Sequence, residues 1–335
     1  MTAAKISHEV PLLEVEGLQV EFRTGGGTVR AVNGVSFTLN QGETLCIVGE
    51  SGSGKSITGE TILGILDSPP GYVTGGRVLY RGQNLLDLGE AELDTIRGRS
   101  IAMVFQDALA TLNPVLPVGE QIAEMYERHL HLPRKQARDA AIAAMEKVQI
   151  PAARERFGDY PHQFSGGMRQ RIMIAMAVAL DPEILIADEP TTALDVTVQA
   201  GIIQLLGDLC AEGRMGLILI THDLGVVANV ADKVAVMYAG RIVEEGPVEA
   251  VFESPRHPYT VGLLRSLPRM GGTAAELVAI PGSPPDPRRI PAGCPFHPRC
   301  PRAGERCRRE LPDLRPVTRQ RAVSCHFAEE VNGAA

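Results

Sequence analysis

The sequence predicts an α/β fold with a largely parallel sheet, and three observations carry that prediction. Short apolar runs with the length of buried strands alternate with longer stretches of helical periodicity along most of the chain. A glycine-rich loop follows one of these strands and opens one of these helices. The 335 residues, 44% of them hydrophobic, are enough to bury a sizeable core in one or two domains.

The first part of the chain has the pattern of strands joined by turns. Residues Val35–Leu39 alternate between apolar and polar side chains, and Thr44–Val48 form an almost continuous apolar run. The three glycines Gly25–Gly27 predict the tip of a hairpin, and Tyr72–Leu79 predict another strand.

Helices and strands alternate in the following part of the chain. The pattern is helical from Val118 to Ile150 with a break at Pro133, and a further helix is expected between Ser165 and Leu180. The next expected elements are the strand Ile184–Ala187, the helix Thr197–Cys210, and the strands Leu217–Ile220 and Val234–Tyr238. Strands that alternate with helices of this length indicate parallel pairing. Proline and arginine predominate after Pro281, which predicts a looped appendage with little regular structure.

The composition argues against several classes of protein. A net charge of −7 argues against a general nucleic-acid coat, and we expect no nucleic-acid partner. The longest apolar run, Ile172–Leu180, is far shorter than the roughly 20 residues of a membrane span. The opening residues MTAAKISHEVP lack the basic and apolar regions of a secretory signal. We therefore expect a chain that neither spans a membrane nor is secreted.

A phosphate-binding loop is predicted at Gly49–Ser56, whose sequence GESGSGKS matches the pattern GxxxxGK[ST] between a strand and a helix. Glycines let backbone N–H groups turn toward phosphate oxygens, and the helix N-terminus adds partial positive charge. Lys55 is expected to reach the β- and γ-phosphates, and the Ser56 hydroxyl to bind Mg²⁺. The alternative, a flexible Gly/Ser turn, is disfavoured by this setting. The residues of this segment expected to bind the nucleotide are Gly49, Ser51, Gly52, Ser53, Gly54, Lys55, Ser56 and Ile57.

Two carboxylates form the second half of the predicted site. Asp188 and Glu189 end the apolar strand Ile184–Ala187, and a parallel arrangement would bring them beside the phosphate-binding loop. Asp188 can then hold a Mg²⁺-bound water, and Glu189 can polarise the attacking water. Alone, such a pair is equally well a solvated strand end. After a phosphate-binding loop it indicates an NTPase.

The segment FSGGMRQR at Phe164–Arg171 resembles the signature motif of the ATP-binding-cassette (ABC) ATPases, with Met168 where that family has Gln. The resemblance covers roughly residues 12–255. Four more positions match family motifs in the family's order: Phe22 as the aromatic that stacks on adenine, Gln106 in VFQD as the Q-loop, Ala193–Asp195 as the D-loop, and His222 in ITHD as the switch histidine. Taken singly, Phe22 would equally be a core residue, Gln106 a surface amide and His222 a strand-end histidine.

The resemblance implies a P-loop NTPase cassette at residues 1–255, with a RecA-like core, an antiparallel β subdomain and a helical subdomain at about 107–180. Residues 256–335 then form a small, loop-rich, cysteine-containing C-terminal extension. Two cassettes of this family pack head to tail, so that the signature of one completes the ATP site of the other. The membrane subunits are expected to dock near Gln106 and the following loop, residues 107–117.

The resemblance also implies a role for each matched residue. Glu189 is the expected general base, and Lys55, Gln106 and His222 complete the catalytic set. Mg²⁺ is expected at Ser56, Gln106 and Asp188. Beyond the phosphate-binding loop, the residues expected to bind ATP are Phe22, Gln106, Asp188, His222, and, at the shared site, Ser165, Gly166, Gly167 and Asp195.

The tail indicates a branch of the family. RHPYT at Arg256–Thr260 and the cysteine-rich tail resemble the C-terminal extension of oligopeptide and dipeptide importer ATPases, and SGGMRQR resembles their D-type subunit. The resemblance implies as partners a distinct F-type ATPase in a head-to-tail heterodimer, two transmembrane permease subunits, and a periplasmic or extracellular substrate-binding protein. It implies a peripheral protein on the cytoplasmic face of a bacterial inner membrane.

Four cysteines lie in an arginine-rich segment, spaced C-x5-C-x6-C-x17-C at Cys294, Cys300, Cys307 and Cys325. In a cytosolic chain such a group indicates a metal site more than a disulfide framework. Zinc ribbons use tight C-x2-C pairs, which this segment lacks, whereas four thiolates in a loop-rich segment suit a [4Fe–4S] cluster. Members of the resembled subfamily can carry such a cluster. Zinc, with His297 or His326 replacing a thiolate, and four reduced thiols in a mobile tail are the alternatives.

The sequence therefore predicts the ATP-binding and hydrolysing subunit of a dipeptide or oligopeptide ABC importer, which energises translocation through separate membrane subunits. Related nickel and glutathione importers share this architecture and remain alternatives. Two rivals from other classes are a soluble ABC ATPase of translation or DNA maintenance and an iron–sulfur redox-linked ATPase. The first rival usually carries two cassettes or a long coiled-coil insertion, and we find neither here.

Overall fold

Two β-sheets form the framework of the molecule in the computed structural model, which describes residues 10–192, 194–266 and 279–331. The strands are β1 (Leu13–Thr24), β2 (Gly27–Leu39), β3 (Thr44–Val48), β4 (Gly71–Tyr80), β5 (Gln83–Asn84), β6 (Ile101–Val104), β7 (Ile184–Asp188), β8 (Gly216–Thr221), β9 (Lys233–Tyr238), β10 (Arg241–Pro247), β11 (Arg315–Thr318) and β12 (Arg321–Val323).

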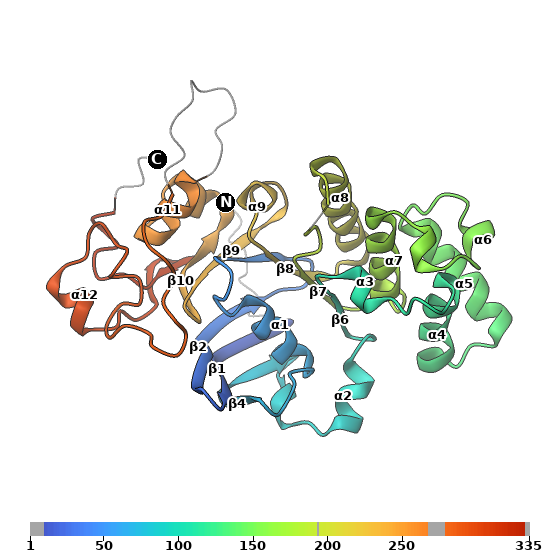
Figure 1. Cartoon of the computed structure of the whole chain (residues 1–335), viewed down its shortest axis with the longest axis horizontal. Helices are drawn as coiled ribbons and strands as arrows, with labels where there is room; N and C mark the ends of the chain where they lie inside the picture. Colours follow the sequence, from blue (N-terminus) through green and yellow to red (C-terminus); the bar gives the residue numbers. More distant parts are fainter. Residues whose placement is uncertain (1–9, 193, 267–278, 332–335) are drawn as a thin grey trace, which may run out of the picture.

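Helices cover the sheets and build one end of the molecule (Figure 1). They are α1 (Lys55–Leu63), α2 (Glu90–Ile96), α3 (Ala108–Thr111), α4 (Val118–Leu130), α5 (Arg134–Lys147), α6 (Ala153–Arg156), α7 (Gly166–Val178), α8 (Val196–Gly213), α9 (Leu224–Val230), α10 (Val248–Glu253), α11 (Pro258–Arg265) and α12 (Glu305–Arg309). Short 3₁₀ turns occupy Leu85–Asp87 and Pro161–Gln163. Among the described residues, no helix combines the length and the apolar character of a membrane span.

The larger sheet has the strand order β11-β12-β10-β9-β3-β8-β7-β6. Its five strands from β9 to β6 are parallel, and β10, β12 and β11 are added antiparallel at one edge. The predicted parallel sheet is confirmed. Every residue of β7 and β8 is buried, which explains why both strands read as continuous apolar runs. Because β3, β7 and β8 are parallel neighbours, their carboxyl ends meet at one edge of the sheet.

The smaller sheet is antiparallel, in the order β2-β1-β4-β5. The β1–β2 hairpin closes with Thr24 opposite Gly27, so the predicted hairpin tip at Gly25–Gly27 is confirmed. The inner faces of this sheet and one face of the larger sheet share a hydrophobic cluster that contains Val20, Phe37 and Ile186. This packing fixes the hairpin beside the loop that follows β3.

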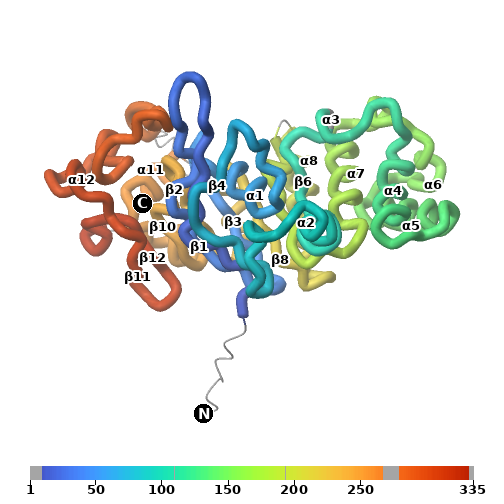
Figure 2. Tube along the Cα trace, turned by 90° about the horizontal axis from the view of Figure 1, so that it is seen from below, coloured from blue at the N-terminus to red at the C-terminus, as the bar shows by residue number. Residues whose placement is uncertain are grey.

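Helices α3 to α7 form one end of the long axis, and the C-terminal extension with α12 forms the other, with the antiparallel sheet between them (Figures 1 and 2). Helix α4 ends at Leu130 and Pro133 is the N-cap of α5, so the helical pattern breaks at Pro133 as predicted. These helices lie within the predicted helical subdomain, whose bounds stay a prediction, as do those of the cassette and the extension.

The C-terminal extension is more regular than the sequence predicted. Instead of a looped appendage it supplies α12 and the strands β11 and β12, and β12 pairs with β10 through Glu244 and Val323. Strands this short have little apolar alternation of their own, so their pattern gave no signal. Pairing also satisfies the backbone groups that β10 would otherwise expose at the sheet edge.

A buried ion pair fastens the extension to the sheet. Glu244 in β10 is fully buried, and its carboxylate accepts from the guanidinium of Arg321 in β12 and from the backbone N–H groups of Arg256 and His257. Arg321 also donates to the Ala250 carbonyl at 2.9 Å. The carboxylate therefore has a donor from each of the two chain segments packed against it.

We expect the Arg321→Ala variant to lose about 3–5 kcal/mol of the free energy of unfolding, because Glu244 would keep a buried charge with no cationic partner. Urea denaturation followed by circular dichroism measures this difference. The control is Arg319→Ala, which removes an exposed arginine from the β11–β12 turn. Equal stability of the two variants would contradict the anchoring role of the pair.

Candidate functional site

The phosphate-binding loop lies between β3 and α1, as the sequence predicts, and its glycines are sterically required. Gly54 has φ 102°, and a Cβ there would lie 2.3 Å from the Ala31 carbonyl oxygen in β2. At Gly49, a Cβ would lie 2.1 Å from the Met237 carbonyl oxygen in β9. The loop is thus seated between the two sheets with no room for side chains at these points. Its backbone forms a cradle of the kind that binds phosphate.

Lys55 is the first residue of α1 and is almost completely buried. Its Nζ donates to the carbonyl oxygens of Gly49 and Glu50, at 2.9 and 3.1 Å. Burial lowers the pKa of Lys55, and the neighbouring carboxylates of Glu189 and Asp188 oppose that shift. The ammonium group therefore lies over the mouth of the loop, facing the acidic end of β7.

Asp188 ends β7 beside the start of α1. Burial raises its pKa, while a hydrogen bond from the Ser56 hydroxyl opposes that shift. The buried Oδ1 of Asp188 has no hydrogen-bond partner among the described residues. A hydroxyl and a carboxylate side by side, with one carboxylate oxygen left over, are the oxygen donors that Mg²⁺ takes. Two of the three residues predicted for the metal, Ser56 and Asp188, are therefore brought together, and Gln106 lines the same cleft as Ser56.

Glu189 follows at the edge of the sheet with a positive φ of 44°, an unfavourable conformation for a non-glycine residue. Its backbone N–H donates to the Ile220 carbonyl at 2.8 Å, which holds it against β8. Its Oε2 accepts from Gln106 Nε2 at 3.2 Å and lies 3.4 Å from His222 Nδ1. Three of the predicted catalytic residues thus meet at one carboxylate oxygen.

Thr192 is a functional candidate that the sequence analysis did not identify. Its hydroxyl donates to Glu189 Oε2 at 3.0 Å and so helps to orient the carboxylate. A hydroxyl three residues after the acidic pair in the sequence is too common in turns to have been recognised as a signal.

One open cleft contains most of these groups. It is lined by Ser51, Gly52, Gly54, Lys55, Ser56, Ile57, Gln106, Glu189 and His222. Phe22 lies outside this set. It is half-buried in β1 at the margin of the hydrophobic cluster that Ile57 also borders. The adenine contact predicted for Phe22 therefore stays a prediction.

The signature residues Ser165, Gly166 and Gly167 also lie outside the set that lines the cleft. Ser165 caps α7, and its Oγ accepts from the Met168 N–H at 3.3 Å. A Cβ on Gly167 would lie 2.4 Å from a Val198 methyl carbon, so α7 and α8 can approach only because residue 167 is glycine. The signature thus presents a helix N-terminus that its own phosphate-binding loop does not use.

Asp195 caps α8, and its Oδ1 accepts from the N–H groups of Thr197 and Val198 at 3.1 and 3.0 Å. Of the other predicted D-loop residues, Leu194 borders the main hydrophobic cluster, and Ala193 lies outside the described residues. Asp195 therefore shapes the start of α8, next to the signature.

All four cysteines of the extension line one small cavity, together with His257 and Phe296. All four are free thiols, and burial raises the pKa of Cys294 and Cys325 to about 11. Within the described residues, no group of three or more His, Cys, Asp or Glu side chains converges so as to hold a metal ion. The zinc alternative requires such convergence on one ion, with His297 or His326 as a ligand. Both histidines instead contact backbone carbonyl oxygens.

Comparison with known protein families gives two matches. Residues 32–192 match the family described as ABC transporter, and residues 243–307 match the C-terminal region of oligopeptide/dipeptide transporters. The first segment contains the phosphate-binding loop and the acidic pair, and the second contains three of the four cysteines.

Curated proteins of bacteria are similar over nearly the whole chain. The oligopeptide transport ATP-binding protein OppD of Bacillus subtilis (strain 168) is 52% identical over 286 residues, 85% of this chain and 80% of that protein. The dipeptide transport ATP-binding protein DppD of the same organism is 50% identical over 319 residues, 95% of each chain. Among solved structures, a dimeric ATP-binding cassette in a post-hydrolysis state with ADP and Pi has a TM-score of 0.63 at 27% identity. That match covers 70% of this chain and 98% of the other.

We expect Glu189→Gln to bind ATP like the parent chain but to lose roughly 10²–10⁴-fold in turnover, because the amide cannot accept a proton from water. Phosphate release by the assembled complex and equilibrium ATP binding are the two measurements. Glu253→Gln, an exposed residue of α10, is the matched control. Hydrolysis at the parent rate in Glu189→Gln would show that another group is the base.

Proposed function

This chain belongs to the ABC transporter ATPases of the oligopeptide and dipeptide type, and we propose how its residues bind ATP and couple hydrolysis to transport. It is the ATP-binding and hydrolysing subunit of a peptide importer, and it works with membrane permeases on other chains. Its relatives are named for oligopeptide and dipeptide transport, which supports a peptide importer. The same names give no support to a nickel or glutathione importer, or to the two rival functions outside transport. The observation that carries the site assignment is the convergence of Gln106, Thr192 and His222 on Glu189 at the rim of the phosphate-binding cleft.

The phosphate-binding loop holds the triphosphate through its backbone N–H groups. Lys55 leaves the loop carbonyls that it contacts here and binds the β- and γ-phosphate oxygens, which are stronger acceptors. The Ser56 hydroxyl and Asp188 would hold Mg²⁺, with Gln106 as a further oxygen donor. When bound, Mg²⁺ neutralises charge that develops on the phosphates.

Glu189 accepts the proton of the attacking water. Its carboxylate is fixed by Thr192 and Gln106, so it is oriented before the substrate arrives. His222 directly follows the next parallel strand, β8, so it lies on the same side and contacts the γ-phosphate. Gln106 is the link to the rest of the transporter, since it joins this carboxylate to the segment that begins at Asp107.

Two cassettes associate head to tail, with the signature of each completing the ATP site of the other. The position of Ser165, Gly166 and Gly167 outside their own cleft supports this arrangement. The free N-terminus of the 13-residue helix α7 offers backbone donors and a positive partial charge to a phosphate from another subunit. The partner cassette is a distinct F-type ATPase subunit, which makes the pair a heterodimer.

The permeases dock on the segment that follows Gln106. Val115 and Leu116 lie in this segment with 73% and 39% of their surface exposed, which is unusual for adjacent large apolar residues. A cytoplasmic helix from each of two permease subunits fits such a surface. The chain then lies on the cytoplasmic face of a bacterial inner membrane, and a substrate-binding protein outside the cell membrane delivers the peptide.

The four cysteines of the extension hold a [4Fe–4S] cluster in this proposal. Four cysteine thiolates are the ligand set that such a cluster takes, so Cys294, Cys300, Cys307 and Cys325 would hold it. The cavity that all four cysteines line supports this proposal. Such a cluster would cross-link the loop of Cys294, helix α12 with Cys307, and the segment after β12 with Cys325. Burial raises the pKa of Cys300, and the positive charge of Arg302 opposes that shift, so this guanidinium would offset part of the charge of the thiolates.

We expect the double variant Val115→Asp/Leu116→Asp to bind ATP normally but to lose its permeases, because the charges disrupt an apolar interface. The test is purification from native membranes in a gentle detergent. The parent chain should retain two permeases, a second ATPase and a peptide-loaded binding protein. Leu130→Asp, at the exposed end of α4, is the control. Recovery of only a redox or nucleic-acid partner with the parent chain would contradict the transport role.

We expect the chain purified without oxygen to be brown and to contain about four irons and four sulfides. Cys300→Ser should lower both contents, whereas Cys210→Ser, a buried cysteine of α8, should change neither. Stoichiometric zinc in the parent chain would overturn the cluster assignment.

A further inference from the structure

We propose that Arg299 of the C-terminal extension, together with Tyr259, is a positioning element for the phosphate-binding loop. Arg299 neutralises Glu50 and Tyr259 holds its backbone, so the loop keeps the shape and charge that accept ATP. The inference rests on the proposed nucleotide site. It assigns part of ATP binding to a region outside the cassette.

The ion pair between Arg299 and Glu50 is short and bidentate. Arg299 Nη1 lies 2.6 Å from Glu50 Oε2, and Nη2 lies 2.9 Å from Oε1. The side chain of Arg299 is 5% exposed and that of Glu50 is 27% exposed, so solvent screens the pair weakly. Arg299 Nε donates to the Pro281 carbonyl at 2.9 Å, which fixes the plane of the guanidinium. This geometry makes the pair a strong, oriented interaction.

Tyr259 supplies the second contact. The backbone N–H of Glu50 donates to Tyr259 Oη at 2.9 Å, so the extension holds this loop residue by both its backbone and its side chain. Tyr259 is fully buried and packs against Tyr238 and Phe296, with ring centroids 4.6 and 5.4 Å apart. Phe296 also lines the cysteine cavity. The position of the tyrosine is therefore fixed by the core of the extension.

The charge of Glu50 makes this contact relevant to ATP. Glu50 is the second residue of the loop, next to Ser51, and its backbone carbonyl accepts from Lys55 Nζ at 3.1 Å. Burial lowers the pKa of Lys55, and the charges of Glu189, Asp188 and Glu50 oppose that shift. An uncompensated carboxylate at this place would repel the triphosphate and compete with it for Lys55. Arg299 cancels that charge without itself entering the cleft that holds the catalytic groups.

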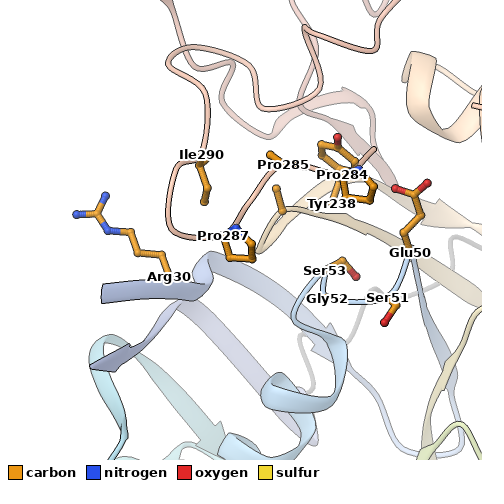
Figure 3. A pocket seen from close by; sticks show the side chains of 11 residues that line it. Arg30, Glu50, Ser51, Gly52, Ser53, Tyr238, Pro284, Pro285, Pro287 and Ile290 are labelled. Atoms are coloured by element: carbon orange, nitrogen blue, oxygen red, sulfur yellow. The ribbon is translucent and has the colours of Figure 1, made fainter. Parts of the chain in front are cut away.

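The extension also covers the outer side of the loop. A small pocket lies between Glu50–Ser53 and residues Pro284, Pro285, Pro287 and Ile290, with Tyr238 at its wall (Figure 3). Prolines have little backbone freedom to lose on folding, so this segment is a rigid support for the outer side of the phosphate-binding loop. The loop is thus enclosed by the cassette on one side and by the extension on the other.

The test is a double-mutant cycle on the full chain with Arg299→Gln, Glu50→Gln and both together, read out as the dissociation constant of a non-hydrolysable Mg-ATP analogue. Arg299→Gln should weaken binding by at least about tenfold, because it leaves the charge of Glu50 unpaired beside the phosphates. Glu50→Gln in the Arg299→Gln background should restore binding to within roughly threefold of the parent. In the assembled transporter, Arg299→Gln should raise KM for ATP and leave kcat unchanged.

Tyr259→Phe is a second variant that leaves the ion pair intact and removes only the acceptor for the Glu50 N–H. We expect about threefold weaker binding of the analogue, and this variant decides the question if Arg299→Gln does not fold. Arg306→Ala, which removes an exposed arginine of α12 that pairs with Glu310, is the control and should bind like the parent.

Two results would overturn the proposal. If Glu50→Gln fails to rescue a folded Arg299→Gln variant, Arg299 only holds the extension together. If Arg299→Gln and Tyr259→Phe both bind the analogue like the parent, the extension has no part in ATP binding. Failure of the parent chain itself to bind the analogue would instead refute the proposed nucleotide site. Lys55→Ala removes the ammonium group that we propose to bind the phosphates, so it shows how weakly the analogue binds when the nucleotide site itself is damaged.

Discussion

The parallel alignment of β3, β7 and β8 is the constraint on which the rest of the site depends. It brings three chain segments to one sheet edge: the phosphate-binding loop, the acidic pair and His222. None of these segments has much regular structure at that point, so each relies on its buried strand for position. Because β7 and β8 are completely buried, shifting the pairing register between these strands by one residue would be very costly in free energy. The register therefore sets the distances among the catalytic groups.

Local chemistry made much of the site predictable from the sequence. The phosphate-binding loop, the acidic pair and the signature each combine a recognisable residue pattern with a recognisable neighbouring element. The strands of the parallel sheet were predictable because burial on both faces leaves an apolar run. Thr192 and the positive φ of Glu189 were not predictable, because both arise from the way the turn after β7 packs against β8.

Contacts between segments far apart in the chain could not be predicted from the sequence, for a different reason. Arg299 and Glu50 are 249 residues apart, and an arginine in an arginine-rich tail has nothing in its sequence to show that it will be buried. The strands β11 and β12 likewise owe their existence to the free edge of β10, since they are too short to show alternation. The extension has the composition of a loose tail, yet pairing and ion pairs tie it to the sheet.

The close approach of two carbonyl groups to the loop glycines has a mechanical consequence. The Ala31 carbonyl belongs to the antiparallel sheet and the Met237 carbonyl to the parallel one, and the loop fills the space between them. The loop cannot widen or shift without displacing at least one of these strands, and the strands are locked into their own ladders. The loop and both sheets should therefore move as a single rigid block through the catalytic cycle. Any bending of the molecule then has to occur at the joints of the block with the helical end, such as the segment after β6, which carries Gln106.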